Sequence, residues 1–468
     1  MRPSLPALAP TESLDEFEMP QMQKAVDMFS ARVPRYTSYP TAPHFHSGVT
    51  EQEYRTWLAG LPADMPLSLY VHVPFCDTLC WFCGCHTKAV NHYRPVRDYC
   101  DLLLEEIALV AEVLPHRHPV QHIHWGGGSP TLLEPGDMLR LNAALRGHFD
   151  VRADAEFAIE VDPRGFTADA ARTLGTAGVT RASIGLQDCD PLVQKAINRV
   201  QSDEETIFAI EQLRGCGIAS INVDILYGLP HQTLASWQRT LEFALRLDPD
   251  RLAVFGYAHM PAFKKHQALI PEALLPGIEM RFRMAELARE FFCGHGYVAV
   301  GLDHFAKPRD PLGRAARDGT LSRNFQGYTA DTAPALIGFG ASSIGSLPQG
   351  YVQNQTLVPG YRAALKAGRL PIARGITLTD DDRARREAIE RLMCDMAVDL
   401  NRIVAKYGET TILADTPAAL SDLIDAGVVS LNDGKAAIAP EWRAAARLVC
   451  AAFDRYLRTG AARHSVSV

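Results

Sequence analysis

Segments with the alternating apolar pattern of β-strands take turns with segments of helical periodicity between residues 67 and 257. Each predicted strand is followed by a predicted helix, and such repeats favour parallel strands joined by right-handed crossovers. The pattern therefore predicts an α/β fold with six parallel strands. The strands are expected at 67–73, 120–125, 156–161, 181–185, 220–226 and 251–257, and the helices near 95–114, 135–147, 168–177, 204–214 and 236–246.

Polar residues and glycines follow each predicted strand. In β/α barrels the carboxyl ends of the strands converge on one mouth, where functional groups collect. Six strands leave such a barrel incomplete, so we expect a partial (β/α)6 barrel with its site at this mouth. The candidate groups are the cysteines after the first strand, then Gly126, Gly127 and Gly128, then Glu160 and Asp162, then Gln187 and Asp188, then Asp224, and finally Tyr257, Ala258 and His259.

The composition of the 468-residue chain is that of a globular protein, with 47% hydrophobic residues and a formal net charge of −7. The negative charge gives no general attraction for nucleic acid or for an anionic membrane surface. The first residues lack the apolar core of a signal peptide, and no later window offers about 18 uncharged apolar residues for a membrane span. We therefore expect a cytoplasmic protein that neither binds nucleic acid nor inserts into a membrane.

Outside the barrel, which is expected at residues 67–300, the sequence predicts three further regions. Residues 1–66 form an N-terminal extension, in which 1–20 are expected to be poorly ordered and 31–48 form an irregular aromatic segment. This segment either caps the fold or acts as a lid, because long irregular stretches in compact domains are often functional. Residues 301–376 are predicted to be a loop-rich extension that completes the active site.

The remaining region, residues 377–468, predicts a mostly helical C-terminal domain. Helical patterns cover 380–407, 416–425 and 440–457, and a hairpin is expected between 428–431 and 436–438 around Asn432-Asp433-Gly434. Helices with a small hairpin are similar to a winged-helix module. Such modules often bind DNA, but the acidity of this chain favours a packing role.

Four of the ten cysteines lie in one loop directly after the first predicted strand: Cys76, Cys80, Cys83 and Cys85. Thiolates suit iron–sulfur clusters, zinc or copper(I), and the first three cysteines have the spacing C-x3-C-x2-C. A structural zinc site usually needs four closed ligands, which a nearby histidine could complete, and a redox C-x-x-C pair is typical of a thioredoxin-like unit. A [4Fe–4S] cluster on three thiolates would keep one iron open for a substrate or cofactor, which favours this third interpretation.

The C-x3-C-x2-C cysteine motif resembles that of radical S-adenosylmethionine enzymes. With its fourth cysteine, the segment PFCDTLCWFCGC is similar to the motif of the oxygen-independent coproporphyrinogen III oxidase family. The likeness covers nearly the whole chain, including the irregular segment and the region past the barrel. The other similar segments are RYTSYPT at 35–41, HWGGGSPT at 124–131, IEVDPR at 159–164, INVDILYGLP at 221–230, YAHMP at 257–261 and RNFQGYT at 323–329.

The resemblance implies a [4Fe–4S] cluster and two molecules of S-adenosylmethionine. The free iron of the cluster would bind the amino and carboxylate groups of the first cofactor molecule. A structural interpretation stands beside each residue, since glycines also make tight turns and carboxylates at strand ends also form ion pairs. The implied cluster ligands are Cys76, Cys80 and Cys83; the residues implied at the first S-adenosylmethionine are Tyr70, Gly127, Gly128, Glu160, Gln187, Arg199, Asp224 and Ala258, and those at the second are Phe325, Gln326 and Ile344.

The fourth cysteine, Cys85, is implied to be a catalytic residue rather than a cluster ligand, and Tyr70 is implied beside the cluster. A purely structural thiol is the alternative for Cys85. The close relatives that handle haem usually lack both this cysteine and the complete RNFQGYT segment. Their presence here therefore favours the oxidase.

The reaction implied is a step of haem biosynthesis, in which two propionate side chains of coproporphyrinogen III become vinyl groups and give protoporphyrinogen IX. A 5′-deoxyadenosyl radical would remove a hydrogen atom from the β-carbon, after which carbon dioxide and one electron leave. The enzyme would be a monomer that needs an external electron donor and a final electron acceptor. Arg32, Arg35 and Arg323 are candidates for binding the substrate carboxylates. The alternative is a haem-binding carrier on the same scaffold without oxidase activity.

Overall fold

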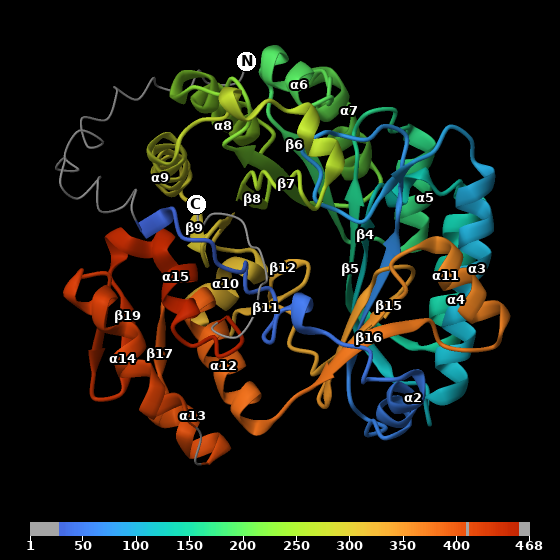
Figure 1. The fold of residues 1–468 in the computed structure, drawn as a ribbon. Coiled ribbons are helices and arrows are strands. Elements are labelled where there is room, and N and C mark those ends of the chain that lie inside the picture. The colour runs from blue at the N-terminus through green and yellow to red at the C-terminus, as the bar shows by residue number, and fades with distance from the viewer. Residues whose placement is uncertain (1–27, 409–410, 458–468) are drawn as a thin grey trace.

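One large mixed sheet organises the computed structural model, which describes residues 28–408 and 411–457 (Figure 1). In these residues the sheet has 12 strands in the order β16-β15-β14-β13-β1-β4-β5-β6-β7-β8-β10-β9. Its central six strands follow one another in sequence and pair in parallel. They are β1 (Leu67–Val73), β4 (Pro119–Gly127), β5 (Asp150–Val161), β6 (Arg181–Gln187), β7 (Ser220–Tyr227) and β8 (Arg251–Gly256).

Helices connect these strands on the outer side of the curved sheet (Figure 1). Several begin at residues that cap the free backbone N–H groups, and Ser202 and Thr233 form capping boxes. The predicted α/β partial barrel is confirmed, with helix bounds close to those expected. The helices are α2 (Glu51–Ala59), α3 (Arg94–Val113), α4 (Pro135–His148), α5 (Ala168–Ala177), α6 (Pro191–Ala196), α7 (Asp203–Gly215), α8 (Leu234–Arg246) and α9 (Ile278–Gly294).

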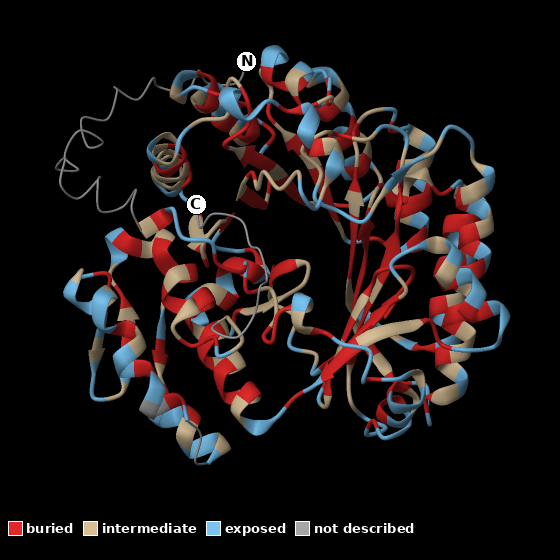
Figure 2. Ribbon diagram, viewed as in Figure 1, coloured by how far each residue is buried: buried red, intermediate tan, exposed pale blue. Residues whose placement is uncertain are grey.

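The main core lies between the sheet and these helices, where Figure 2 shows the strands as almost continuously buried. Val71, Trp125, Ile159, Ile184 and Val223 come from five successive strands and are completely buried. Burying one such side chain contributes about 1.5–3 kcal/mol to folding. In the described residues no helix has the length and apolar character needed to cross a membrane.

The segment at 301–376 extends the sheet, so the prediction of a loop-rich extension is wrong. Strand β13 pairs in parallel with β1, and three antiparallel strands follow it. The strands escaped prediction because they are short and show no sustained periodicity. The elements are β9 (Val298–Val300), β10 (His304–Ala306), α10 (Pro311–Asp318), β11 (Ser322–Asn324), β12 (Gly327–Thr329), β13 (Ala335–Phe339), β14 (Ile344–Leu347), β15 (Gly350–Asn354), α11 (Val358–Lys366) and β16 (Ile372–Thr377).

Residues 380–457, here called the C-terminal module, pack around a second apolar core. The expected hairpin is present as β18 and β19, but a third strand, β17, pairs with β19. The helix predicted at 380–407 is therefore two helices, because Met396 adopts a left-handed conformation with φ of 60°. The helix predicted at 440–457 is shorter, and Trp442 departs from helical geometry. The elements are α12 (Asp380–Asp395), β17 (Ala397–Asp399), α13 (Leu400–Tyr407), α14 (Ile412–Asp425), β18 (Val429–Asn432), β19 (Lys435–Ile438), η6 (Pro440–Ala445) and α15 (Ala446–Ala451).

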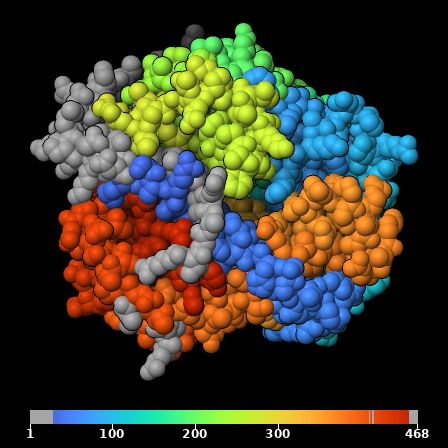
Figure 3. All heavy atoms as spheres, in the orientation of Figure 1, coloured from blue at the N-terminus to red at the C-terminus, as the bar shows by residue number. Residues whose placement is uncertain are grey.

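The irregular segment at 31–48, here called the strap, connects the C-terminal module to the edge of the sheet. Arg447 donates hydrogen bonds to the carbonyl oxygens of Val33 and Pro34, at 2.6 and 3.0 Å. At the other end, His46 pairs with Gly375 of β16. Figure 3 shows the strap (blue) crossing this face between the red and orange parts of the chain. The expectation for residues 1–20 lies outside the described residues, while the domain boundaries and the winged-helix likeness stay predictions.

Candidate active site

The cysteine loop leaves the carboxyl end of β1 and is closed at its base by a pair of two-residue strands, β2 (Phe75–Cys76) and β3 (Lys88–Ala89). Cys76, Cys80, Cys83 and Cys85 all line one cavity of about 230 Å³, here called the cysteine cavity. Strand ends from the neighbouring β/α units form its other walls. The loop thus gathers its thiols at the barrel mouth, as the sequence predicts.

Two guanidinium groups lie against the buried thiol of Cys80. The Sγ atom is 3.5 Å from Nη2 of Arg164 and 3.6 Å from Nη1 of Arg199. The carboxylate of Asp162 holds both arginines, at 2.6 Å from Arg164 Nη2 and 3.2 Å from Arg199 Nη1. Burial opposes the ionisation of Asp162, but Arg199 and Arg164 outweigh it and hold the pKa of this carboxyl below its usual value. Two cationic side chains therefore lie beside one of the three thiols of the motif.

The segment around 264–267 fixes the second half of the cysteine loop. Lys264 donates a hydrogen bond to the carbonyl oxygen of Cys85 at 2.9 Å, and Nε2 of His266 lies 2.8 Å from the carbonyl oxygen of Cys83. The backbone N–H of Cys85 in turn donates to the Sγ atom of Cys83 at 3.4 Å. These contacts hold the loop over the barrel, and the side chains of Cys83 and Cys85 are also hydrogen-bonded to each other.

The glycine turn after β4 packs too tightly for any side chain. A Cβ atom on Gly127 would lie 2.5 Å from the ring of His72, and one on Gly128 would lie 2.4 Å from the carbonyl oxygen of Phe75. The backbone N–H of Gly127 donates to Glu160 at 2.9 Å, and Nε2 of His124 lies 3.3 Å from the same carboxylate. Burial would raise the pKa of Glu160, yet these hydrogen bonds bring it below its ordinary value. The structural and the cofactor-binding interpretations of this turn are therefore compatible. The glycines allow close packing because they have no side chain, and their backbone lines the cavity.

Polar side chains from β6 and β7 form another wall of the cysteine cavity. Asp224 accepts hydrogen bonds from Ser183 at 2.9 Å and from Asn222 at 2.7 Å, and burial raises its pKa. Gln187 has a positive φ of 68° at the end of β6, a conformation that non-glycine residues adopt rarely. Arg199 donates a hydrogen bond from Nη2 to the carbonyl oxygen of Gly185 at 2.5 Å. The wall thus offers a carboxylate, an amide and a guanidinium.

The residues of the cysteine cavity fit a [4Fe–4S] cluster and S-adenosylmethionine. Three thiols from one loop face the same space, with Arg164 and Arg199 beside one of them, which suits a cluster that carries negative charge. The Nε atom of Arg199 is buried without a hydrogen-bond partner among the described residues. Among the residues that the structure describes, no three histidine, cysteine or acidic side chains are arranged to hold a single metal ion. A single zinc ion, which needs sulfur ligands at about 2.3 Å, fits this arrangement less well.

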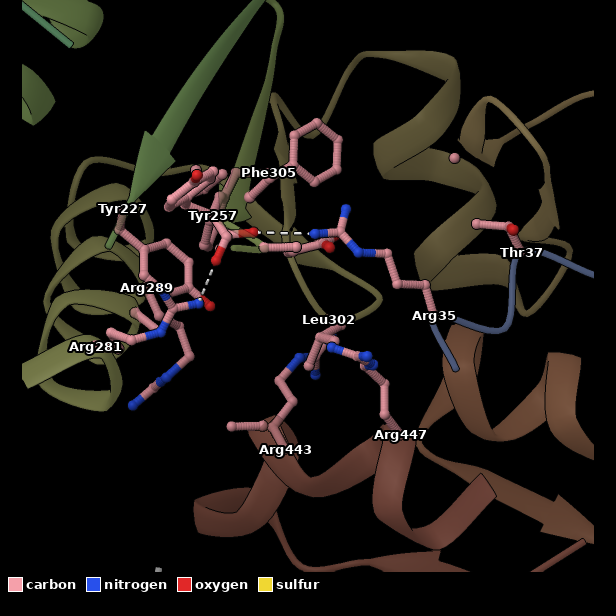
Figure 4. Close-up of a pocket in the computed structure, with 18 of the residues that line it drawn as sticks. Arg35, Thr37, Tyr227, Tyr257, Arg281, Arg289, Leu302, Phe305, Arg443 and Arg447 are labelled. Carbon is pink, nitrogen blue, oxygen red and sulfur yellow. Dashed lines mark hydrogen bonds between the residues drawn. The ribbon is translucent and has the colours of Figure 1, made fainter. Parts of the chain in front are cut away.

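Cys85 also lines two further cavities beside the cysteine cavity. The first, here called the arginine cavity, has a volume of about 360 Å³ (Figure 4). The second, here called the apolar cavity, has a volume of about 670 Å³ and is lined by side chains such as Phe82, Leu226, Met260 and Phe263. The arginines of the first cavity are Arg35, Arg281, Arg289, Arg323, Arg443 and Arg447, and its acidic residues are Glu286 and Asp303.

Known proteins resemble this chain over almost its full length. The model of the Radical SAM superfamily matches residues 70–244. The chain is 48% identical to the oxygen-independent coproporphyrinogen III oxidase of Bradyrhizobium diazoefficiens, over 95% of this chain and 99% of that protein. It therefore belongs to the oxygen-independent coproporphyrinogen III oxidase family.

Other members of the family agree with this assignment. The Paracoccus denitrificans protein of the same name is 43% identical over 96% of this chain and all of its own length. The solved structure of coproporphyrinogen III oxidase (HemN) from Escherichia coli, described as a radical SAM enzyme, superposes with a TM-score of 0.86. It has 36% sequence identity and covers 91% of this chain and 100% of that chain. The resemblance seen in the sequence is thus confirmed, and the [4Fe–4S] cluster and S-adenosylmethionine are the cofactors of this family.

The structure brings together most of the site residues expected from the family resemblance. Tyr70 is not among the residues that line the cysteine cavity, and its hydroxyl lies 3.0 Å from Nδ1 of His72. Ala258, Phe325 and Gln326 line the arginine cavity instead. Ile344 packs with Phe325 against a small apolar cluster near Tyr351. The residues that line the cysteine cavity are Cys76, Cys80, Cys83, Cys85, Gly127, Gly128, Glu160, Gln187, Arg199 and Asp224.

Two kinds of site residue were not expected from the sequence. Arg164 lies within the quoted IEVDPR segment, so the family motif contained the signal although the residue was assigned no role, whereas its partner Asp162 was already a candidate at the end of its strand. Arg443 and Arg447 belong to no motif quoted above and lie in a segment of helical periodicity. Nothing in the local sequence therefore indicates that they belong to a site. Among the arginines expected at the mouth, Arg35 and Arg323 line the arginine cavity, whereas Arg32 is exposed and lines none of the three cavities described.

Proposed function

We propose that this chain is an oxygen-independent coproporphyrinogen III oxidase, which converts two propionate side chains of coproporphyrinogen III to vinyl groups and gives protoporphyrinogen IX. The single observation that supports it best is the identity of 48% across 95% of the chain to a relative of that name. The three thiols at the barrel mouth agree with it. Relatives named as oxidases also favour this function over a haem-binding carrier.

Cys76, Cys80 and Cys83 would hold the [4Fe–4S] cluster in this proposal. When bound, the cluster and S-adenosylmethionine together supply a 5′-deoxyadenosyl radical that abstracts hydrogen from the substrate. Arg199 and Asp224, both on the cavity wall, would orient the cofactor through its carboxylate and amino groups. Glu160 would contribute through the carboxylate that already holds the glycine turn.

Cys85 holds a special place in the proposal because it lines all three cavities. A substrate in the arginine or apolar cavity would therefore meet this thiol on the side that faces the cluster. We propose Cys85 as a catalytic residue. We also propose a catalytic role for Tyr70, whose hydroxyl is hydrogen-bonded to His72. Phe325, Gln326 and Ile344 remain the proposed neighbourhood of a second S-adenosylmethionine.

The strap supplies a physical means of protecting a radical from water. Val33, Pro34 and Arg35 line the apolar cavity, so the strap covers part of the mouth. Its hydrogen bonds to Arg447 hold it there. An enclosed site suppresses side reactions of reactive intermediates. The external electron donor, the final electron acceptor, the monomeric state and the cytoplasmic location remain predictions.

The test is an anaerobic assay of the reconstituted enzyme with a reductant, S-adenosylmethionine and coproporphyrinogen III. We expect release of carbon dioxide, formation of 5′-deoxyadenosine and appearance of a protoporphyrin product after oxidation. The same mixture without reductant is the control. Tight binding of haem without any 5′-deoxyadenosine would contradict the proposal and favour the carrier.

A further inference from the structure

Arginines from four separate parts of the chain converge on the arginine cavity (Figure 4). Arg35 reaches in from the strap, and Arg281 and Arg289 lie on α9. Arg443 and Arg447 come from η6 and α15 of the C-terminal module, which lie below the cavity in this view, whereas α9 lies at its left. Arg323 belongs to β11. The C-terminal module is therefore a wall of this cavity.

Among the described residues, carboxylates pair with only some of these arginines. Arg289 forms an ion pair with Glu286 at 2.7 Å, and Asp303 is hydrogen-bonded to His304. In the described residues no carboxylate lies within 4.0 Å of the guanidinium groups of Arg35, Arg323 or Arg443.

The close approach of these arginines also affects the pKa values of Arg443 and Arg447. Burial, together with the charge of Arg35, lowers the pKa of Arg447 to about 10. Burial also lowers the pKa of Arg443, and neighbouring Arg289 adds to this effect. Buried positive charge of this kind is costly unless an anion pairs with it. The cavity is thus better suited to an anionic ligand than to an empty state.

The apolar cavity lies against the arginine cavity, and the two share Arg35, Cys85, Phe255, Gly256, Tyr257 and Ala258. A ligand that spans them would have a broad apolar body and several carboxylates. A tetrapyrrole with four propionates has this chemistry. The arrangement also places such a body next to Cys85, at the border of the cysteine cavity.

We infer that Arg443 and Arg447 bind carboxylates of the substrate from the side of the C-terminal module, together with Arg281 and Arg35. This inference rests on the proposed function and gives the C-terminal module a direct part in it. Arg443 is the more informative residue to test. Among the described residues its side chain donates one hydrogen bond, from Nε to the carbonyl oxygen of Gly301 at 2.6 Å, whereas Arg447 also holds the strap.

The first experiment compares three variants of the cluster-loaded enzyme in the anaerobic assay. For Arg443→Gln we expect the KM for coproporphyrinogen III to rise by about tenfold or more, because a charged hydrogen bond to the substrate is lost. The kcat should stay within about twofold, since this bond forms in both ground and transition states. Arg443→Lys should recover part of the affinity by keeping the charge. Arg402→Gln, an exposed change on α13 of the same module, is the matched control and should leave both constants unchanged.

The second experiment measures binding of stable porphyrins to the same proteins by fluorescence quenching. Coproporphyrin III has four carboxylates and protoporphyrin IX has two, so Arg443→Gln should weaken binding of the former more than that of the latter. Iron content and S-adenosylmethionine binding should match those of the unmodified enzyme. An equal loss for both porphyrins, or a KM no different from that of Arg402→Gln, would overturn the inference. Absence of turnover by the unmodified enzyme would instead contradict the proposed function.

Discussion

The cysteine cavity and the arginine cavity differ in how their charges are balanced and in how far apart their residues lie in the sequence. In the cysteine cavity, Arg164 and Arg199 share the carboxylate of Asp162, and the walls come from consecutive β/α units. In the arginine cavity, six arginines face two acidic residues and come from segments between Arg35 and Arg447. The first cavity therefore follows from strand order, whereas the second exists only when the C-terminal module and the strap are docked.

The largest effect is expected when a cluster ligand of the cysteine cavity is removed. Cys80→Ser should abolish cluster binding and all turnover, because the thiolate that faces Arg164 and Arg199 is lost. Cys85→Ser should keep the iron content and the visible absorption while activity falls. Iron analysis and absorption spectra of both variants, prepared anaerobically, give the measurement. Equal iron loss in the two variants would refute the assignment of three ligands.

Removing the shared carboxylate would make the cysteine cavity resemble the arginine cavity. In Asp162→Asn, Arg199 stays buried beside Arg164 without its counter-charge, so we expect a loss of about 3–5 kcal/mol in the free energy of unfolding. Thermal denaturation of the loaded enzyme measures this loss. Asp154→Asn breaks an exposed pair with Arg152 and is the control, for which no measurable change in the melting temperature is expected. If Asp162→Asn melted at the same temperature as this control, the carboxylate of Asp162 would not be needed to balance the charge of Arg199 and Arg164. The expected difference between the two cavities would then be wrong.

The attachment of the barrel to the strands beyond it should depend on pH. Glu106 of α3 accepts hydrogen bonds at 2.6 Å from the N–H of Gly340, from Asn354 and from Tyr361, and burial raises its pKa to about 7. The unfolded chain loses this proton near pH 4.5, whereas the folded chain keeps it. The free energy of unfolding should therefore fall by up to about 3 kcal/mol as the pH rises between these two values, and then level off.

Two neighbouring variants test this dependence on pH. Glu106→Gln removes the titrating group and should flatten the slope, as measured by melting temperature across the same pH range. Glu105→Gln changes the adjacent residue, which is half-exposed and pairs with Lys366, and should keep the slope of the unmodified protein. A slope that survives in Glu106→Gln would assign the effect to other groups.

The smallest effect is expected from the packing of the glycine turn in the cysteine cavity. Gly127→Ala would place a Cβ atom 2.5 Å from the ring of His72 in a backbone with φ of 113°, so we expect a loss of about 1–3 kcal/mol. Gly147→Ala, in the exposed part of α4 with no atom near its Cβ position, should instead add about 0.5–1 kcal/mol. Chemical denaturation of both variants measures the difference. Equal stability would mean that the turn is less tightly packed than the structure shows.

The six parallel strands and their helices could be predicted from the sequence because each element carries its own apolar period and capping signals. The strands of 301–376 could not, since segments as short as His304–Ala306 are too brief to show a period. The C-terminal module was predicted in part: the hairpin was recognised around Asn432-Asp433-Gly434, but the break at Met396 was not. A left-handed methionine has no sequence signature, because its conformation is imposed by the packing of β17 on β19.

The sequence by itself was enough to predict the three cluster ligands, the family and the order of the barrel strands. These features are local, since the thiols lie within one loop and consecutive strands pair with each other. Only the tertiary structure decided that Arg443 and Arg447 meet Arg35 and Arg281 in one cavity. Charges from distant segments meet through the packing of whole modules, and no local periodicity or motif records where that packing will bring them.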